Sequence, residues 1–485
     1  MSRKLNRRDF MKKSVLVAGL ASTFSIDKSV ADGKILGAND RIRIAVAGVN
    51  GRGQSHVDAF AKMENVQVVC LVEPDSKVRE KVQKIVQDKF GNTPETFSDL
   101  RKALEGDRFD ALSIASCNHS HALLSIWAIQ AGKDVYVEKP CSHNVYEGRQ
   151  IVNAAKKFKA IVQHGTQSRC SNQCAKIVQA AKSGKYGRLR IAKGYCCKPR
   201  WTIGYKPEQA PPSTLDWNSW LGPASEQPYH ANLVHYNWHW FWATGNGDIG
   251  NQGIHELDIA RWGIGQNLPK KVISFGARYV DEPERGFKDQ GETPNMILTL
   301  YEFDDVLMLF ETRGLVKKDT KWDNQVDYEF YTNQGLLKGE YFYPNGSNEK
   351  VKLDVEYQKP HAGSPFNNFI DCVRDRKSEN LDAPIQEGHY SAALAHIGNV
   401  SWQLGKIDSE AAIRKAFGDN EVTQKAVDAV FQNLSDALPD LKNPQFQLGP
   451  KLAFDPAAEK FVGNEQANAM LTRQYREPFV VPNMG

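Results

Sequence analysis

Three features are scarce or missing in this chain of 485 residues, and each absence excludes a class of protein. The eight cysteines include no CxxC pair, so the sequence predicts no zinc site and we expect no bound metal. After residue 31 there is no uninterrupted apolar run of about 18 residues, so we expect no stable membrane span. The net charge of +5 is carried by residues 1–31, and the remaining chain is close to neutral. We therefore expect no nucleic-acid partner.

Residues 1–31 have the pattern of an export signal. They hold seven basic and two acidic residues, an apolar stretch, and small residues at Ser29 and Ala31 that suit cleavage. NRRDFMKK, with Arg7 and Arg8, resembles the twin-arginine signal. We predict export to the periplasm or beyond the cytoplasm by this route, which carries folded proteins and permits cofactor loading before export. A basic N-terminus on a cytoplasmic protein is the alternative.

The clearest pattern is a strand, a glycine turn, a helix, a second strand and an acid, in that order. Two apolar, β-branched runs flank a helix-like stretch within residues 42–72. Gly48, Gly51 and Gly53 lie in the turn, where glycine lets a pyrophosphate approach the helix N-terminus. Glu73 ends the second strand, where a carboxylate can bind ribose hydroxyls. The pattern predicts a dinucleotide site, and Glu73 favours NAD because it would repel the 2′-phosphate of NADP.

The turn departs from the usual GxGxxG spacing. Asn50 occupies the place of the middle glycine, so the spacing here is GxxGxG. Asn50 and Arg52 are nevertheless assigned to the cofactor, because they lie in the same turn. The alternative is an ordinary βαβ unit with a glycine-rich turn.

The fold class predicted from the remaining pattern is α/β. Strand-like and helix-like stretches alternate up to about residue 164, which predicts a doubly wound parallel sheet of the Rossmann type. From about residue 188, closely spaced strand-like runs predict a large, open, mainly antiparallel sheet. The predicted division is a signal peptide (1–31), an NAD-binding domain (32–165), a substrate and oligomerisation domain (166–407) and a C-terminal extension (408–485).

Polar residues gather where the predicted parallel strands end. Asn118, His119 and His121 follow one strand, and Glu138 and Lys139 follow the next. Ligands of doubly wound sheets bind beyond the carboxyl ends of the strands. We therefore assign Asn118, His121, Glu138 and Lys139 to the cofactor.

Four stretches together resemble a known family. They are AGVNGRG (47–53), NHSH (118–121), AGKDVYVEKP (131–140) and GDIGNQGIHELDIARW (247–262). The resemblance is to the Gfo/Idh/MocA family of NAD(P)-dependent oxidoreductases, which act on sugars and cyclitols. It covers roughly residues 41–405. It implies a Rossmann domain followed by an α/β domain whose open sheet often forms the oligomer interface, so we expect a homo-oligomer.

The resemblance also implies two catalytic residues. Lys139, in EKP, would lie beside the nicotinamide and the substrate hydroxyl, and His255 would accept or donate the hydroxyl proton. Both roles suit the chemistry, because hydride leaves a carbinol carbon only as its hydroxyl proton is removed. A nearby ammonium stabilises the developing alkoxide. The alternatives are a cofactor contact for Lys139 and a core position for His255.

Four residues are assigned to the substrate. Many relatives carry aspartate four residues before the catalytic histidine, whereas this chain has Asn251. Helical spacing predicts that Asn251, His255 and Asp258 share one face, so Asn251 and Asp258 would bind sugar hydroxyls. Trp238 and Trp240 alternate in sequence, so on an extended chain their rings would share one face and suit a sugar ring. Core packing is the alternative for either tryptophan.

Three functional hypotheses follow. The first is an exported NAD-linked oxidoreductase acting on a sugar, sugar derivative or cyclitol, with tightly bound cofactor and a redox-neutral cycle. The second is an NAD-dependent glycosidase or lyase, in which transient oxidation acidifies a neighbouring C–H, elimination expels the leaving group, water adds and hydride returns. The third is a sugar-binding protein without catalysis. In the exported enzyme, residues 32–40 are expected to lie over the nucleotide and slow its escape.

Overall fold

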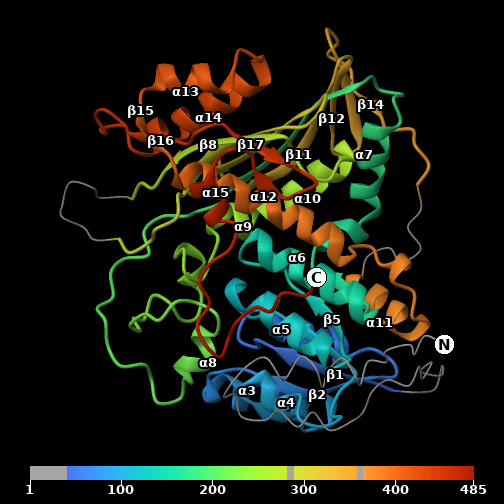
Figure 1. The fold of residues 1–485 in the computed structure, drawn as a ribbon. Coiled ribbons are helices and arrows are strands. Elements are labelled where there is room, and N and C mark those ends of the chain that lie inside the picture. The colour runs from blue at the N-terminus through green and yellow to red at the C-terminus, as the bar shows by residue number, and fades with distance from the viewer. Residues whose placement is uncertain (1–40, 281–288, 358–363) are drawn as a thin grey trace, which may run out of the picture.

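The computed structural model describes residues 41–280, 289–357 and 364–485. The predicted export signal and the segment 32–40 lie outside these ranges. The described chain forms two sheets with helices packed between and around them (Figure 1). No helix within the described ranges combines the length and the hydrophobicity needed to cross a bilayer.

The first sheet is parallel throughout, with the strand order β3-β2-β1-β4-β5-β6 in the described residues. Its strands are β1 (Ile42–Ala47), β2 (Val66–Val72), β3 (Glu95–Phe97), β4 (Ala111–Ile114), β5 (Asp134–Val137) and β6 (Val162–His164). Its helices are α2 (Arg52–Ala61), α3 (Ser76–Phe90), α4 (Leu100–Ala103), α5 (Asn118–Gln130) and α6 (Val145–Phe158). Strands such as β4 and β5 are buried along their whole length, as expected when helices cover both faces. The predicted Rossmann-type sheet is confirmed.

The second sheet is mixed but mainly antiparallel, and β7 and β10 form its parallel pair within the described residues. Its first strands are β7 (Leu189–Cys197), β8 (Lys271–Ala277), β9 (Met296–Glu302), β10 (Leu307–Arg313), β11 (Gln325–Thr332), β12 (Gly335–Lys338), β13 (Tyr341–Pro344) and β14 (Val351–Lys352). Four short strands follow late in the chain: β15 (Lys406–Asp408), β16 (Phe446–Leu448), β17 (Leu452–Asp455) and β18 (Lys460–Phe461). Because β16 and β17 both pair with β8, the extension is built into this sheet.

The remaining helices fall into three groups. Between the two sheets lie η1 (Gln167–Cys170), α7 (Asn172–Lys182), α9 (Gly247–Asn251), α10 (Gly253–Ile264) and α12 (Ile385–Gln403). The irregular segment 198–246 holds α8 (Trp217–Leu221) and η2 (Asn237–Trp240). Late in the chain come α11 (Pro365–Asp375), η3 (Ser378–Asn380), α13 (Glu410–Phe417), α14 (Glu421–Ala437) and α15 (Glu465–Ala469). α10 packs on the second sheet through Ile254 and Leu257, which fixes the helix that carries His255.

The chain returns to the first domain after building the second. α11 packs against the first sheet, where Phe369 and Ile370 join the core that contains Phe60 and Tyr136. Part of the predicted segment 166–407 therefore packs with the first domain.

The outer face of the second sheet is partly covered by the chain itself. α13 and α14 pack on outward side chains of β8, β9 and β10, among them Phe275, Leu298 and Leu309. Figure 1 shows these two helices above the sheet, on the side away from the first domain. The neighbouring strands β7 and β11 carry charged side chains on the same face, such as Lys193 and Glu329.

Candidate active site

A cavity of about 490 Å³ lies beyond the carboxyl ends of β1, β2, β4 and β5. Its floor is the first domain, from Gly48 in the glycine turn to Lys139 after β5. Its other walls come from the second domain, through Asn251 and His255, and from the segment 198–246. The predicted cofactor and catalytic residues therefore meet in one space, as expected for a doubly wound sheet.

The shape of the glycine turn lets a pyrophosphate approach its backbone closely. Gly48 has φ of +76°, and a Cβ there would lie 2.5 Å from the backbone of Ser116. A Cβ on Gly53 would lie 1.8 Å from the carbonyl oxygen of Gly48, so neither position accepts a side chain. Gly51 faces open space on the cavity side and caps α2 without a side-chain hydrogen bond. The N-terminal N–H groups of α2 are thus available to a pyrophosphate.

Glu73 lies at the end of β2, only 5% exposed, and lines the cavity. Its carboxylate oxygens accept hydrogen bonds from the backbone N–H groups of Val49 (3.1 Å) and Asp75 (3.2 Å). Burial raises the pKa of Glu73 to about 7, and these two N–H donors only partly offset that effect. A buried acceptor at this place suits the two hydroxyls of the adenosine ribose.

Replacing Glu73 by Ser is expected to weaken NAD binding by roughly tenfold or more and to improve NADP binding, because the substitution removes a charged acceptor from the ribose. In the native protein, ribose hydroxyls favour the ionised carboxylate, so NAD binding lowers the pKa of Glu73 and releases a proton. NAD affinity should therefore rise as the pH increases through about 7. Dissociation constants measured at pH 6 and pH 8 check this. A pH dependence that persists in the Glu73→Ser variant would contradict it.

Glu138 lies in the floor of the cavity and contacts several polar side chains there. Its Oε1 accepts hydrogen bonds from Arg52 (2.8 Å) and Gln167 (3.0 Å), and lies 3.0 Å from Nε2 of His56. Burial alone would raise the pKa of Glu138, but His56, Arg52 and Lys139 together hold it below its usual range. Glu138 is therefore an anion that fixes the cationic side chains around it.

Lys139 is held by Asn251 across the domain boundary. Its Nζ donates to the backbone carbonyl of Asn251 (2.6 Å) and lies 3.3 Å from the side-chain Oδ1 of the same residue. An ammonium has three N–H donors, so one remains for a group in the cavity. Burial lowers the pKa of Lys139, while the carboxylates of Glu138, Asp248 and Glu256 act in the opposite direction.

Two histidines face the same cavity. His255, on α10, has no hydrogen-bond partner for its ring among the described residues, and burial together with Lys139 lowers its pKa to about 3. His239, on η2, lies flat against Trp238, with ring centroids 3.6 Å apart. Nδ1 of His239 is 2.6 Å from the carbonyl oxygen of Tyr236, so Nδ1 carries the hydrogen and Nε2 is an acceptor. Burial lowers the pKa of His239 to about 3. Both rings are neutral at pH 7.

His239 was not among the residues predicted for the site. Its alternation with the tryptophans placed it on the opposite face of an extended chain. The structure instead forms a 3₁₀ helix over Asn237–Trp240, so consecutive residues do not alternate. Trp238 lines the cavity, whereas the prediction for Trp240 is wrong: its ring is buried against the guanidinium of Arg200, 5.2 Å away, and does not line the cavity.

The prediction that Asp258 binds substrate is also wrong. Asp258 is fully buried, and its carboxylate pairs with Arg169 (2.7 Å) and accepts a hydrogen bond from Ser391 (2.6 Å). His255 and Asp258 both belong to α10 (Gly253–Ile264), but the partners of Asp258, Arg169 and Ser391, hold its side chain away from the cavity. Asn251 and His255 line the cavity, and Asp258 points into the core between α10 and α12.

The other predicted cofactor residues lie in or under the cavity wall. Asn50, Arg52, Asn118 and His121 all line it. His121 also supports the wall, because its ring nitrogens lie 2.7 Å from the carbonyl oxygen of Pro140 and 2.9 Å from that of Ser116. Gly53 does not line the cavity, and its contribution is the tight packing of the turn.

Family models match two consecutive parts of the chain. The model described as the NAD-binding Rossmann fold of an oxidoreductase family matches residues 42–166, and the model of its C-terminal alpha/beta domain matches residues 171–278. The two matched parts are domains of the Gfo/Idh/MocA oxidoreductase family. The first domain is the NAD-binding Rossmann domain of that family, which confirms the predicted cofactor.

Individual family members are distant. The chain is 24% identical to the rhizopine catabolism protein MocA of Rhizobium meliloti, over 47% of this chain and 58% of that one. It is 22% identical to myo-inositol 2-dehydrogenase of Thermotoga maritima, over 57% and 75%. It is 26% identical to an alpha-N-acetylgalactosaminidase of Shewanella oneidensis, over 41% and 48%. The chain thus spans about half the length of most relatives it matches.

Solved structures of two oxidoreductases share the fold. The WlbA dehydrogenase from Bordetella pertussis, in complex with NADH and UDP-GlcNAcA, gives a TM-score of 0.53 at 17% identity, covering 73% of this chain and 94% of that one. The aldose-aldose oxidoreductase from Caulobacter crescentus, complexed with glycerol, gives 0.52 at 16% identity, covering 73% and 95%.

Proposed function

We propose that this protein uses NAD to oxidise a hydroxyl of a sugar, sugar derivative or cyclitol, with Lys139 and His255 at the reacting carbon. One observation carries the proposal: Lys139 and His255 line the same cavity as the glycine turn and Glu73. A nucleotide anchored by the turn and by Glu73 would run along the floor toward Lys139. A substrate would then lie between Lys139 on one domain and His255 on the other.

The side chains present can perform the proton part of such a reaction. When bound, NAD supplies the hydride acceptor. Lys139 directs its third N–H at the substrate oxygen and stabilises the negative charge that develops there. His255 is neutral over the physiological pH range because its pKa is about 3, so its ring can accept the hydroxyl proton. Asn251 accepts hydrogen bonds from Nζ of Lys139 through its backbone and side-chain oxygens, and so holds the ammonium at the boundary between the two domains.

The substrate class rests on the walls and on the relatives. The second-domain wall offers Asn251, His239 and His255 as hydrogen-bonding groups, beside the aromatic rings of Tyr236 and Trp238. Polar groups beside flat rings suit a polyhydroxylated ring. The relatives named above include a myo-inositol 2-dehydrogenase and an alpha-N-acetylgalactosaminidase.

The test of this function has two parts. Purified protein is denatured and the released nucleotide identified, and the native protein is then mixed with a panel of sugars and cyclitols while NADH absorbance is followed. We expect NAD in the protein, or its binding on addition, and reduction by at least one member of the panel. A protein that neither contains nor binds NAD would remove the proposal.

A second candidate is an NAD-dependent glycosidase or lyase, favoured by Asn251. An amide cannot raise the basicity of His255 as a carboxylate would, so a simple lysine–aspartate–histidine relay is incomplete here. An alpha-N-acetylgalactosaminidase is among the relatives. Release of sugar from a glycoside panel without added cofactor would favour this reaction. Binding without turnover would favour a sugar-binding protein.

We further propose that NAD stays bound throughout a redox-neutral cycle, in a protein exported by the twin-arginine route and assembled as a homo-oligomer. Support for export comes from the leader sequence alone, and NAD is not expected to be maintained outside the cytoplasm. Free NAD added to purified enzyme with a substrate should therefore give no sustained NADH production, and substrate conversion should proceed without it. Steady, multiple-turnover NADH formation with an exchanging cofactor would contradict retention.

A further inference from the structure

The last residues of the chain form part of the first domain. Residues 471–485, here named the tail, leave the second domain after α15 and cross α5 and α6 (red trace, Figure 1). Phe479, Val481 and Met484 are buried in the core of the first domain. The backbone N–H of Met484 donates to Oε1 of Gln150 at 2.6 Å, which holds the end of the tail on α6.

Phe479 joins the tail to the wall of the nucleotide cavity. Its ring is 3% exposed, and its centroid lies 4.6 Å from Cζ of Arg101 and 4.8 Å from Cζ of Arg476. The ring of Trp127, on α5, is 6.1 Å away. Phe479 and Trp127 both line the cavity. The tail therefore supplies one wall of this space and is held there by two guanidinium groups.

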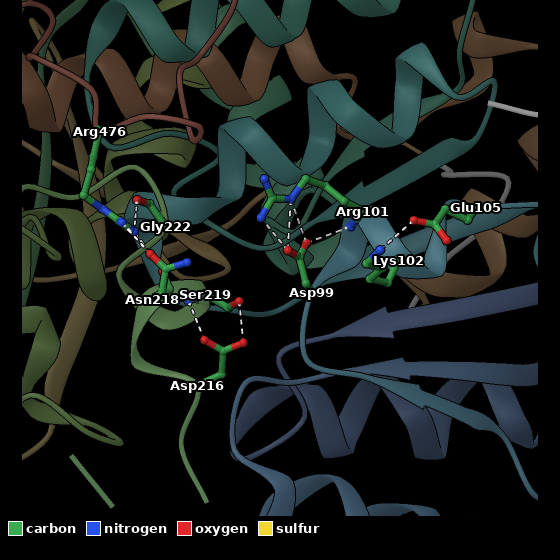
Figure 2. A network of polar contacts seen from close by, with 9 residues as sticks. All are labelled: Asp99, Arg101, Lys102, Glu105, Asp216, Asn218, Ser219, Gly222 and Arg476. Carbon is green, nitrogen blue, oxygen red and sulfur yellow. Dashed lines mark hydrogen bonds and ion pairs between the residues drawn. The ribbon is translucent and has the colours of Figure 1, made fainter. Parts of the chain in front are cut away.

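Arg476 ties the tail to α8, which also lines the cavity (Figure 2). Its guanidinium donates to the side-chain and backbone oxygens of Asn218, at 2.5 Å and 2.8 Å, and to the carbonyl of Gly222 at 3.0 Å. Asp216 caps this short helix by accepting from the backbone N–H of Ser219 at 3.0 Å. Ser219 and Gly222 line the cavity. Arg476 thus joins two walls that belong to distant parts of the sequence.

The strand order places this junction at the adenine end. Lys139 follows β5, Glu73 follows β2 and Asp99 follows β3, and the order β3-β2-β1-β4-β5 puts Asp99 beyond Glu73 as seen from Lys139. Asp99 lines the cavity and pairs with Arg101, whose Nε lies 2.9 Å and 3.1 Å from its two carboxylate oxygens (Figure 2). Arg101, so fixed, lies against Phe479. A nucleotide with its ribose at Glu73 has its base between these walls.

We propose that the tail is part of the NAD site and controls release of the cofactor. Phe479 walls the adenine end of the cavity and Arg476 fastens α8 to the tail, so the nucleotide leaves only when the tail lifts. This inference rests on the proposed NAD-dependent function and gives its retained cofactor a physical basis. It assigns to the C-terminal tail the retaining role that the sequence suggested for residues 32–40.

The test compares NAD release from the full-length protein and its variants. Each protein is loaded with radiolabelled NAD and chased with an excess of unlabelled NAD, and retained label is followed after rapid gel filtration. Phe479→Ala and Arg476→Ala should each speed release by roughly tenfold or more, because losing closing contacts acts mainly on the dissociation rate. Val86→Ala is the matched control: it removes a buried first-domain side chain on α3, outside the tail and away from the cavity lining, and should release NAD within about twofold of wild type.

Each outcome decides one point. Equal release from wild type and both Phe479→Ala and Arg476→Ala would overturn the tail inference and leave the proposed function standing. Equal acceleration by Val86→Ala would also overturn it, because general loosening of the first domain would then explain the effect. A wild-type protein that binds no NAD would remove the proposed function itself. Thermal unfolding checks each fold, and if Phe479→Ala does not fold, Phe479→Leu and Arg476→Gln decide by the same comparison.

Discussion

Replacing Lys139 by Met is expected to lower turnover by roughly a thousandfold or more while leaving the fold and the bound NAD in place. Met has a similar length but no N–H donor, so the substrate oxygen loses the group that stabilises its developing charge. Removing one such donor from a preorganised site costs about 10²–10³ in rate, and Lys139 also brings a positive charge. NAD should remain, because its anchors are the glycine turn and Glu73.

The measurement is kcat together with nucleotide content and the thermal midpoint. Lys198→Met is the matched control, since Nζ of Lys198 donates to Gln252 (2.7 Å) in the break between α9 and α10 but does not line the cavity. That variant should keep kcat within a few-fold of wild type, as for a substitution away from the reacting atoms. A near-normal rate in Lys139→Met would show that the reacting centre lies elsewhere.

Replacing His255 by Ala is expected to lower kcat by about 10²–10⁴, the usual range for a general acid–base group. His239→Ala is the informative comparison, because His239 faces the same cavity with its Nε2 as an acceptor. If His255 accepts the hydroxyl proton, its loss should be far more damaging than the loss of His239. The reverse ranking would assign the proton to His239.

The pH profile provides a second readout for His255. Burial and Lys139 lower its pKa to about 3, so the ring stays neutral until the pH falls through that value. The rate should therefore show no loss near pH 6.5, where an ordinary histidine would become protonated. On the alkaline side, the rate should fall as the pH rises, because the ammonium of Lys139 loses a proton. Since burial lowers the pKa of Lys139, this fall should begin before the pH reaches 10.5, the ordinary pKa of a lysine. An acid limb near pH 6.5 would contradict this description of His255.

The parts of the site that the sequence predicted are those determined locally. The turn at Gly48, the strand before it and the acid at Glu73 depend on neighbours within one βαβ unit, so their spacing is enough. Lys139 and His255 were found through the family resemblance, since nothing in the spacing says that two distant segments meet. The structure brings them to one cavity because Lys139 follows β5 at the carboxyl edge of the first sheet, and α10, packed on the second sheet, presents His255 to the same cavity.

The parts that the sequence could not predict depend on partners far along the chain. Asp258 has the right helical spacing for the site, but Arg169 and Ser391 decide its orientation. Both partners are distant in the sequence, so no local pattern could predict these contacts. The sequence did not predict where the tail lies. The segment is interrupted by prolines and its one phenylalanine is Phe479, so it has no hydrophobic periodicity. The strands β16 and β17 are too short for alternation to show, and their pairing with β8 is a long-range effect.

The two helices on the outer face of the second sheet change what a second copy of the chain could contact. α13 and α14 already bury the apolar side chains of β8, β9 and β10. The remainder of that face carries ion pairs, Lys193 with Glu311 and Lys338 with Glu329, at 3.0 Å and 2.7 Å, and both carboxylates are largely shielded from solvent. Any association through these strands would depend on charge more than on apolar burial. Because the carboxylates of these pairs are largely shielded, such a contact should tolerate added salt better than one between exposed charges.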